Sequence, residues 1–284
     1  MSYNTLISAT ALQQEINNPK WVMLDCRFSL ANSNTGSTAY RHGHITNARY
    51  AHLDNDLSSR ITDLTGRHPL PDFNGLVKKL GAWGISNDTQ VVAYDDAGGA
   101  FAGRLWLLLK CLGHEKVAVL DGGIKHWQQQ QFPITTTLPR IKPTVFRPYL
   151  DTTRWLNASQ VQDKLAKQAI ILIDARTPER FRGEQEPIDP IAGHIPKAKN
   201  RAFQLNLDSN GLFLSADRLQ DQFKQLIGRT ASENVVHYCG SGVTACHNSL
   251  AMEYAGLRGS KIYAGSWSDW IRNKNRAIAK SKIL

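Results

Sequence analysis

Short apolar runs rich in β-branched residues alternate along this chain with segments whose apolar positions recur at helical spacing. Residues 76–84 (LVKKLGAWG) precede the run 90–96 (QVVAYDD), and residues 102–113 (AGRLWLLLKCLG) precede the run 117–123 (VAVLDGG). Strands this apolar are typical of a parallel sheet that is covered by helices on both faces. The pattern therefore predicts an α/β fold.

Four sequence blocks occur twice along the chain, in the same order. The pairs are VMLDCR (22–27) with ILIDAR (171–176), GHITNA (43–48) with GHIPKA (193–198), VVAYDD (91–96) with VVHYCG (235–240), and VLDGGIKHW (119–127) with IYAGSWSDW (262–270). Every pair is separated by 143 to 150 residues. Because the offset is nearly constant, the blocks indicate a duplicated domain.

The two copies are joined by a proline-rich segment, residues 132–150 (FPITTTLPRIKPTVFRPYL), which contains four prolines and shows no periodicity. Such a composition is typical of a linker. We expect an N-terminal domain over residues 1–135, a linker over 136–150 and a C-terminal domain over 151–284. The two domains are expected to pack side by side with a cleft between them.

The composition is that of a globular protein, with 42% hydrophobic and 20% charged residues. No apolar run approaches the roughly 20 residues that span a bilayer, and the first residues lack the pattern of a signal peptide. The net charge of +10 comes without a nucleic-acid-binding motif, so it suits the attraction of small anions better. The four cysteines have no zinc-ligand spacing, which predicts a cytoplasmic protein with reduced thiols and no metal or cofactor.

Cys239 directly follows the apolar run VVHY and precedes the glycine-containing stretch GSGVTA (240–245). In parallel sheets ligands collect at the carboxyl ends of the strands, which is where this thiol is expected. A helix is predicted to begin near Val243, so its positive end would favour a thiolate, and loop amides would stabilise an anion attached to it. The alternative is a buried cysteine that fills a small space in the core.

The aligned loop of the first copy, YDDAGGAFAGRLW, has Asp95 where the second copy has Cys239. The fold therefore does not require a cysteine here, which favours a reactive thiol in the second copy and a catalytically silent first copy. Phosphate-ester hydrolysis and sulfur transfer both use a cysteine in such a loop. A phosphatase needs an arginine six residues after the cysteine, and because Ala245 stands there, sulfur transfer is the better interpretation.

The sequence resembles the rhodanese superfamily over essentially its whole length, in particular the two-domain sulfurtransferases. The resemblance rests on the LDCR and IDAR strands, the GHI segments, RFRGEQEP (180–187), CGSGVTA (239–245), and the DGG and AGSWSDW blocks. The cysteine loop is similar to that of 3-mercaptopyruvate sulfurtransferases. Thiosulfate-preferring members usually carry two cationic residues directly after the cysteine, where this chain has Gly240 and Ser241.

The resemblance implies two tandem rhodanese-like domains and a ping-pong reaction through a persulfide on Cys239. A sulfur donor would load the cysteine and release pyruvate or sulfite. A thiol, cyanide or a thioredoxin-like protein would then remove the sulfur. The resemblance also implies that the loop residues Gly240, Gly242, Val243 and Thr244 bind the substrate.

For proton transfer the resemblance implies a set made of Ser241 with His68 and Asp54 from the first copy. The latter two match the family by their position relative to the first GHI block. Taken alone, each residue has a simpler interpretation: a loop hydroxyl for Ser241, an exposed loop histidine for His68 and a helix cap for Asp54.

The resemblance also implies that Arg180 binds the carboxylate of the donor, whereas taken alone Arg180 could form a surface salt bridge. Family members that use mercaptopyruvate commonly have a second arginine nine residues later, and this chain has Asp189 there. The departure weakens the case for mercaptopyruvate against thiosulfate. Arg182 and Arg104 are the candidates to replace the missing charge.

We therefore expect a sulfurtransferase with a small anionic donor, 3-mercaptopyruvate in first place and thiosulfate as the alternative. The alternative from another class is a non-catalytic sulfur relay that receives sulfur from a partner protein. No nucleic acid or membrane partner is expected, and a monomer is the default. Cys26 and Cys111 are expected to be packing residues, and Cys246 a residue of the helix core more than a disulfide partner of Cys239.

Overall fold

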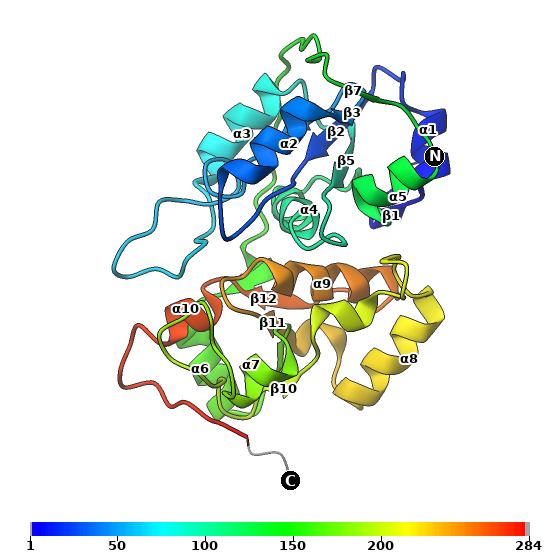
Figure 1. Ribbon diagram of the computed structural model, residues 1–284. Helices are drawn as coiled ribbons and strands as arrows, with labels where there is room; N and C mark the ends of the chain where they lie inside the picture. The colour runs from blue at the N-terminus through cyan, green and yellow to red at the C-terminus, as the bar shows by residue number, and fades with distance from the viewer. Residues whose placement is uncertain (1, 282–284) are drawn as a thin grey trace. The chain divides into compact units, whose positions relative to one another are not determined.

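The computed structural model describes residues 2–281 and divides into two compact units (Figure 1). The first unit contains the residues up to 59, residues 70–151 and residues 209–213. The second unit contains residues 60–69, residues 152–208 and the residues from 214 onwards. The short segment 60–69 therefore belongs to the unit that holds Cys239, although it lies in the first half of the sequence.

A five-stranded parallel sheet forms the centre of the first unit, in the order β1-β6-β5-β2-β4. Its strands are β1 (Leu6–Ile7), β2 (Trp21–Asp25), β4 (Arg49–Tyr50), β5 (Gln90–Tyr94) and β6 (Val117–Leu120). A separate antiparallel pair joins β3 (His44–Ile45) to β7 (Ile134–Thr135). Strands β2 and β5 are buried along their whole length, as expected for strands that are covered on both faces.

Helices pack against this sheet. They are α1 (Ala9–Gln14), α2 (Asn34–His42), α3 (Phe73–Ala82), α4 (Ala102–Cys111) and α5 (Gly123–Gln129). Side chains of α1, α2 and α5, among them Leu12, Tyr40 and Trp127, share one apolar cluster with Met23 and Tyr94 of the strands. Helix α4, which takes no part in that cluster, is buried throughout and packs on β5 and β6.

The second unit repeats this sheet in the order β10-β9-β11-β12-β8, again with every pair parallel. Its strands are β8 (Trp155–Leu156), β9 (Ile171–Asp174), β10 (Lys199–Asn200), β11 (Val235–Tyr238) and β12 (Lys261–Tyr263). When the strands are numbered within each copy, the two sheets have the same order. The predicted duplicated α/β fold is therefore confirmed.

The helices of the second unit alternate with its strands, as they do in the first unit. They are α6 (Ala158–Ala166), α7 (Pro178–Arg182), α8 (Ala216–Ile227), α9 (Thr244–Tyr254) and α10 (Ser266–Trp270), with 3-10 turns η1 (Thr152–Arg154), η2 (Phe203–Asn206) and η3 (Ser232–Asn234). Val161 of α6 and Trp267 of α10 share an apolar cluster with Leu172, Val236 and Tyr263 of the strands. Helix α9 packs on β11 and β12, so it lies directly beside the strand that precedes Cys239.

The repeated Asp-x-Arg blocks form the same buried ion pair in each unit. Arg27 Nε donates to both carboxylate oxygens of Asp25, at 3.0 and 2.9 Å, and its Nη2 donates to the Gly43 carbonyl at 2.7 Å. Arg176 makes the equivalent bonds to the aspartate and the glycine of its own blocks. Each pair thus ties the end of a central strand to a GHI segment, which explains why the two blocks recur together.

The proline-rich residues 136–150 contain no helix or strand and cluster with the first unit. The Thr144 amide donates to the Gly81 carbonyl at 2.9 Å. The Asn87 side chain bonds to the backbone of Arg147 through both its amide nitrogen and its oxygen, at 2.7 and 2.9 Å. The segment is thus irregular, and hydrogen bonds to its backbone hold it on the first unit.

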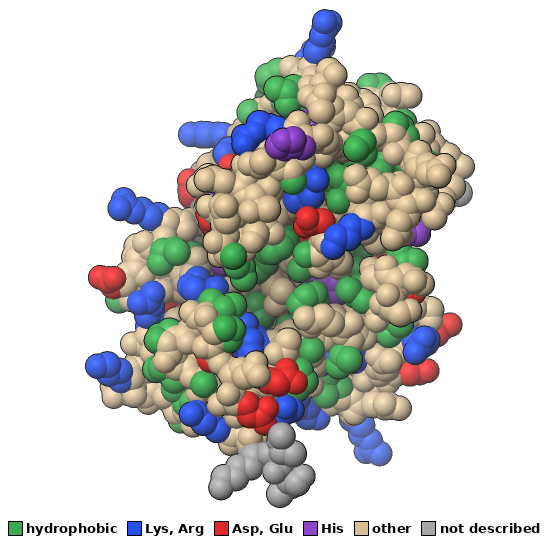
Figure 2. All heavy atoms as spheres, in the orientation of Figure 1, with side chains coloured by type: hydrophobic (Ala, Val, Ile, Leu, Met, Phe, Trp, Pro, Cys, Tyr) green, Lys and Arg blue, Asp and Glu red, His purple; other side chains and the backbone are tan. Residues whose placement is uncertain are grey.

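The surface carries basic side chains in many places. On the face shown in Figure 2, Lys and Arg side chains stand apart from one another, with acidic side chains between some of them. This arrangement differs from the continuous basic stripe that is typical of nucleic-acid-binding proteins. Within the described residues, no helix combines the length and the apolar character that a membrane span requires.

His237, in the middle of β11, should make the stability of the protein depend on pH. The side chain is fully buried, and burial, with the charge of Arg201 acting in the same direction, lowers the pKa of His237 to about 3. Below about pH 6.5 the unfolded chain binds a proton that the folded chain cannot accept. From this residue alone, the free energy of unfolding should therefore fall by about 2 kcal/mol between pH 7 and pH 5, measured by urea unfolding.

His237→Leu should remove that part of the pH dependence and keep the stability at pH 7. Nδ1 of the ring has no hydrogen-bond partner among the described residues, and Nε2 contacts only the Met252 sulfur, at 3.2 Å, so little is lost with the imidazole. The control is His42→Gln, at an exposed position of α2. Equal pH dependence in His237→Leu and the unmodified protein would contradict this account.

Candidate active site

The position of Cys239 follows from the strand order of the second sheet. Strand β11 pairs in parallel with both β9 and β12. All four of its residues are buried, and the strand ends at Tyr238. Cys239 comes next, with 2% of its surface exposed. Its amide donates to Ser266 Oγ at 3.1 Å, and its carbonyl accepts from the Trp267 amide at 3.0 Å. The start of α10 therefore fixes the backbone that carries the thiol.

Gly242 shapes the loop around the thiol. Its amide donates to Cys239 Sγ at 3.1 Å, and its φ of +82° is one that L-residues rarely adopt. A Cβ atom at this position would lie 2.2 Å from the Ala264 carbonyl oxygen, so the loop requires glycine here. Helix α9 begins two residues later, at Thr244, and its positive N-terminal end lies next to the loop.

The equivalent loop of the first unit shows what this kind of backbone binds. Asp95 follows β5 as Cys239 follows β11. The Asp95 carboxylate accepts four hydrogen bonds at 2.8 to 2.9 Å, from the backbone amides of Ala97, Gly99, Phe101 and Ala102. The loop is thus a cradle of amides around an anion, and in the first unit the chain's own carboxylate fills it.

The cradle of the second unit contains backbone amides that have no hydrogen-bond acceptor within residues 2–281. At the offsets of Ala97, Gly99 and Phe101 the chain has Ser241, Val243 and Ala245. The structure gives the amides of these three residues no acceptor within residues 2–281. The cysteine sulfur accepts from the amide of Gly242. An anion bonded to Cys239 Sγ would therefore meet amide donors that no other group occupies.

Segment 60–69 brings His68 to the cysteine loop. His68 Nδ1 lies 2.7 Å from Ser241 Oγ, and each of these residues has 6% of its surface exposed. The neighbouring Arg67 amide donates to Ser268 Oγ at 3.0 Å, which anchors the segment on α10. A serine hydroxyl that is hydrogen-bonded to an imidazole can deliver or accept a proton through that bond.

Two arginine side chains meet beside Gly240. A Cβ atom on Gly240 would lie 2.8 Å from Arg67 Nη2 and 3.4 Å from Arg180 Nη2. Gly240 is not among the residues with positive φ, so its glycine matters for space and not for backbone conformation. The absence of a side chain at this position leaves room for two guanidinium groups directly next to Cys239.

Two buried carboxylates hold these arginines. Asp189 accepts from Arg67 Nε at 2.9 Å, from Arg67 Nη2 at 3.1 Å and from Arg180 Nη2 at 3.4 Å. Glu186 accepts from Arg180 at 2.6 and 3.2 Å and from Arg176 at 3.1 Å. Burial acts to raise the pKa of Glu186, but hydrogen bonds from Arg180 and from the Asp189 amide outweigh it and hold that pKa below its usual value. Glu186 therefore stays ionised and fixes Arg180.

Asp54 lies in the first unit, on the exposed turn after β4. Its amide donates to His52 Nδ1 at 3.1 Å. Partial burial acts to raise the pKa of the Asp54 carboxyl above its usual value, and the charge of His52 acts to lower it. Of the three residues considered for proton transfer, Ser241 and His68 are in hydrogen-bond contact, whereas Asp54 belongs to the other unit.

The arginine next to Arg180 is Arg67, which no motif in the sequence indicates. Of the two candidates for the missing charge, Arg182 pairs with Glu184 at 2.7 and 2.8 Å, and Arg104 belongs to α4 of the first unit. The signal in the sequence was the position of Arg67 directly before His68 in GRHPLP.

All four cysteines are buried, and none of them forms a disulfide within the described residues. Cys246 lies in α9, where its Sγ donates to the Gly242 carbonyl at 3.2 Å. Burial, with nearby carboxylates acting in the same direction, raises the pKa of the Cys26 thiol well above its usual value. Cys26 is therefore held as a neutral thiol.

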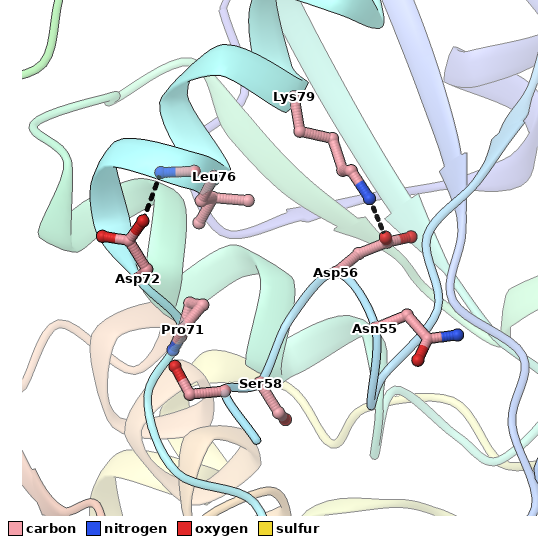
Figure 3. A pocket seen from close by; sticks show the side chains of 9 residues that line it. Asn55, Asp56, Ser58, Pro71, Asp72, Leu76 and Lys79 are labelled. Carbon is pink, nitrogen blue, oxygen red and sulfur yellow. Dashed lines mark hydrogen bonds and ion pairs between the residues drawn. The ribbon is translucent and has the colours of Figure 1, made fainter.

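A pocket of about 350 Å³ lies in the first unit (Figure 3). Its charged groups are already engaged: Lys79 pairs with Asp56, and Asp72 accepts the Asn74 and Gly75 amides at the start of α3. The buried Ser58 hydroxyl has no partner among the described residues. The cysteine loop is the better candidate for an active site than this pocket, because a thiol, a serine–histidine pair and two guanidinium groups meet there.

The chain is similar to known proteins over almost its whole length. A family model for the rhodanese-like domain matches residues 8–130 and 157–273. Over 281 residues the chain is 43% identical to a probable 3-mercaptopyruvate sulfurtransferase of Pseudomonas aeruginosa, covering 98% of this chain and 99% of that one. Over 279 residues it is 30% identical to a thiosulfate sulfurtransferase of Rattus norvegicus, covering 95% and 93%.

The fold has the same relatives. The structure of a 3-mercaptopyruvate sulfurtransferase from Leishmania major superimposes with a TM-score of 0.82 and 26% sequence identity, covering 93% of this chain and 73% of that chain. The two segments that match the family model contain four of the five strands of each parallel sheet, and the edge strands β1 and β8 directly precede them. The chain therefore belongs to the rhodanese family, with two rhodanese-like domains in tandem.

Proposed function

We propose that this sulfurtransferase takes a sulfur atom from 3-mercaptopyruvate, carries it as a persulfide on Cys239 and passes it to a thiol acceptor. The observation that carries the proposal is the cradle around Cys239, whose amides at Ser241, Val243 and Ala245 have no acceptor within residues 2–281. Such donors stabilise a thiolate and an outer persulfide sulfur alike. The relatives named for mercaptopyruvate and thiosulfate support this reaction class.

In the first half-reaction the Cys239 thiolate attacks the sulfur of the donor. A sulfur–sulfur bond forms, the carbon–sulfur bond breaks, and the electron pair of that bond leaves with the carbon as the enolate of pyruvate. The enolate carbon needs a proton to become pyruvate, and we propose that the hydrogen-bonded Ser241–His68 pair delivers it. In the second half-reaction the acceptor thiolate attacks the outer sulfur and releases Cys239.

Asp54 is proposed to assist His68 in this proton transfer. The raised pKa of its carboxyl suits a group that shares or holds a proton near the reaction. The loop residues Gly240, Gly242, Val243 and Thr244 are proposed to contact the transferred sulfur or the donor, and Arg180 its carboxylate. The acceptor class is proposed to include small thiols, cyanide and thioredoxin-like proteins.

Thiosulfate is the second candidate donor, because two arginines beside Cys239 also suit a sulfonate-like anion. Comparing kcat/KM for the two donors decides between them, and we expect mercaptopyruvate to give the higher value. Turnover of neither free donor, together with loading of Cys239 by a partner's persulfide, would instead establish a non-catalytic sulfur relay. A reducing, cytoplasmic location is proposed because none of the four cysteines forms a disulfide within the described residues, and a monomer is proposed as the default.

Ser241→Ala should lower kcat with mercaptopyruvate by about ten- to a hundredfold and leave thiosulfate turnover within about threefold. The reason is that sulfite leaves thiosulfate without protonation at carbon, whereas the pyruvate enolate requires it. Steady-state kinetics with both donors measures the difference. Ser249→Ala, in α9 and away from His68, is the matched control. An equal loss with both donors would assign Ser241 to loop structure and not to proton delivery.

A further inference from the structure

The guanidinium groups of Arg67 and Arg180 approach one point, the space above the Gly240 Cα. Gly240 follows Cys239 directly, so any anion held by both arginines would lie next to the reactive sulfur. Neither arginine is a freely moving surface side chain, since 22% of the Arg67 side chain and 16% of the Arg180 side chain are exposed. The geometry is that of a binding site with two fixed cationic groups.

Each arginine keeps donors that the protein does not use. Arg67 bonds to Asp189 through Nε and Nη2, and Arg180 bonds to Glu186 and Asp189 through Nε and Nη2. Within residues 2–281, the Nη1 group of each has no acceptor. The Nη1 groups are thus the donors that an incoming carboxylate or sulfonate could use, because such anions accept charge-assisted hydrogen bonds from guanidinium groups.

Asp189 would weaken such a site if its carboxylate faced the anion. Instead, 2% of its side chain is exposed, and both of its oxygens accept hydrogen bonds from arginines. Its bidentate contact fixes the plane of the Arg67 guanidinium and leaves the far edge free. Asp189 therefore acts as the residue that holds Arg67 in place.

We propose that Arg67 and Arg180 together grip the anionic end of the sulfur donor and that Asp189 positions Arg67 for this task. The inference rests on the proposed function, because it takes the donor to be a small anion that reacts at Cys239. It makes the aspartate at position 189 part of the donor site, although its charge is opposite to that of the donor-binding arginine.

Arg67→Gln should raise the KM of the anionic donor by about ten- to a hundredfold and change kcat by less than about threefold, because the lost contacts bind the donor before and during reaction. Asp189→Asn should act in the same direction, and more weakly, because it only loosens Arg67. Arg182→Gln, which removes an arginine that pairs with Glu184, should leave both constants unchanged. Unchanged KM in Arg67→Gln, with normal turnover, would overturn the inference and leave the proposed function intact.

A charge exchange separates positioning from folding. Arg67→Asp combined with Asp189→Arg keeps one arginine and one aspartate at the same contact and returns a cationic group to the site. The double variant should recover at least about a third of the loss in kcat/KM caused by Arg67→Asp alone. Lack of any recovery, with a normally folded double variant by circular dichroism, would count against Asp189 as a positioning residue.

Binding can also be measured without sulfur transfer. Pyruvate is a carboxylate that cannot donate sulfur, and its affinity for Cys239→Ser is measured by isothermal titration calorimetry. Adding Arg67→Gln to that variant should weaken pyruvate binding by about tenfold or more, whereas adding Arg182→Gln should not. Equal pyruvate affinity with and without Arg67 would overturn the inference, whatever the enzyme's activity. Conversely, the predicted loss of affinity in a protein that forms no persulfide would uphold the anion site and reject the proposed function.

Discussion

Cys239→Ser should abolish sulfur transfer, with kcat reduced by about 10⁴-fold or more for every donor. A serine hydroxyl is a weak nucleophile toward sulfur and cannot form a persulfide. The loop should survive the change, since the backbone at position 239 is held by Ser266 and Trp267 through its own amide and carbonyl. Intact mass after incubation with mercaptopyruvate or thiosulfate should show one added sulfur atom in the unmodified protein and none in the variant.

Cys246→Ser is the matched control for this experiment. Cys246 lies in the same buried region, and its Sγ bonds to the Gly242 carbonyl, a bond that a serine hydroxyl can also make. This variant should still gain one sulfur atom and keep turnover within about threefold of the unmodified protein. If the added sulfur persists in Cys239→Ser and disappears in Cys246→Ser, the persulfide forms on Cys246 and the proposal is wrong about the cysteine.

The fold was predictable because its signals are local. The apolar strand runs, the two Asp-x-Arg blocks and the glycine loops each specify an element within a few residues. Their recurrence at one offset specified the duplication. What the local pattern does not give is the course of segment 60–69, which clusters with the second unit because Gly66 and Arg67 pack against Gly265 and Ser268.

The site was predictable to the extent that it is contained in one loop. Cys239, Gly242 and the start of α9 lie within a few residues of one another, and their chemistry follows from the order strand, loop, helix. Arg67 was not predictable in this way, because its role depends on Asp189, which is 122 residues away. A carboxylate at position 189 is unfavourable for an anion site when it is considered alone, and it becomes intelligible only with its partner.

The duplicated loops differ in what their backbone amides bind. In the first unit the Asp95 carboxylate uses four amides and thereby stabilises the start of α4. In the second unit the shorter reach of Cys239 leaves amides open, and the loop gives up that internal stabilisation. The loop of the second unit is thus a similar cradle of amides in which a cysteine stands in place of the carboxylate.

Gly242→Ala should reduce kcat/KM by about a hundredfold or more and lower the stability of the second unit. Two effects add at this position. A left-handed φ costs an alanine about 1–2 kcal/mol, and its Cβ would lie 2.2 Å from the Ala264 carbonyl oxygen. Because that oxygen belongs to the backbone, the loop itself must move. The movement would separate the Gly242 amide from Cys239 Sγ and disturb the amides that stabilise the transferred sulfur.

Gly211→Ala separates the two effects. Gly211 has a φ of +79°, close to that of Gly242, but no atom lies within 4 Å of the position of its Cβ. It should therefore lose about 1–2 kcal/mol of stability and keep its activity. Urea unfolding and steady-state kinetics on both variants provide the comparison. If Gly242→Ala retained activity equal to Gly211→Ala, the cradle around Cys239 would not depend on the geometry of this loop, and amide stabilisation of the persulfide would have to be abandoned.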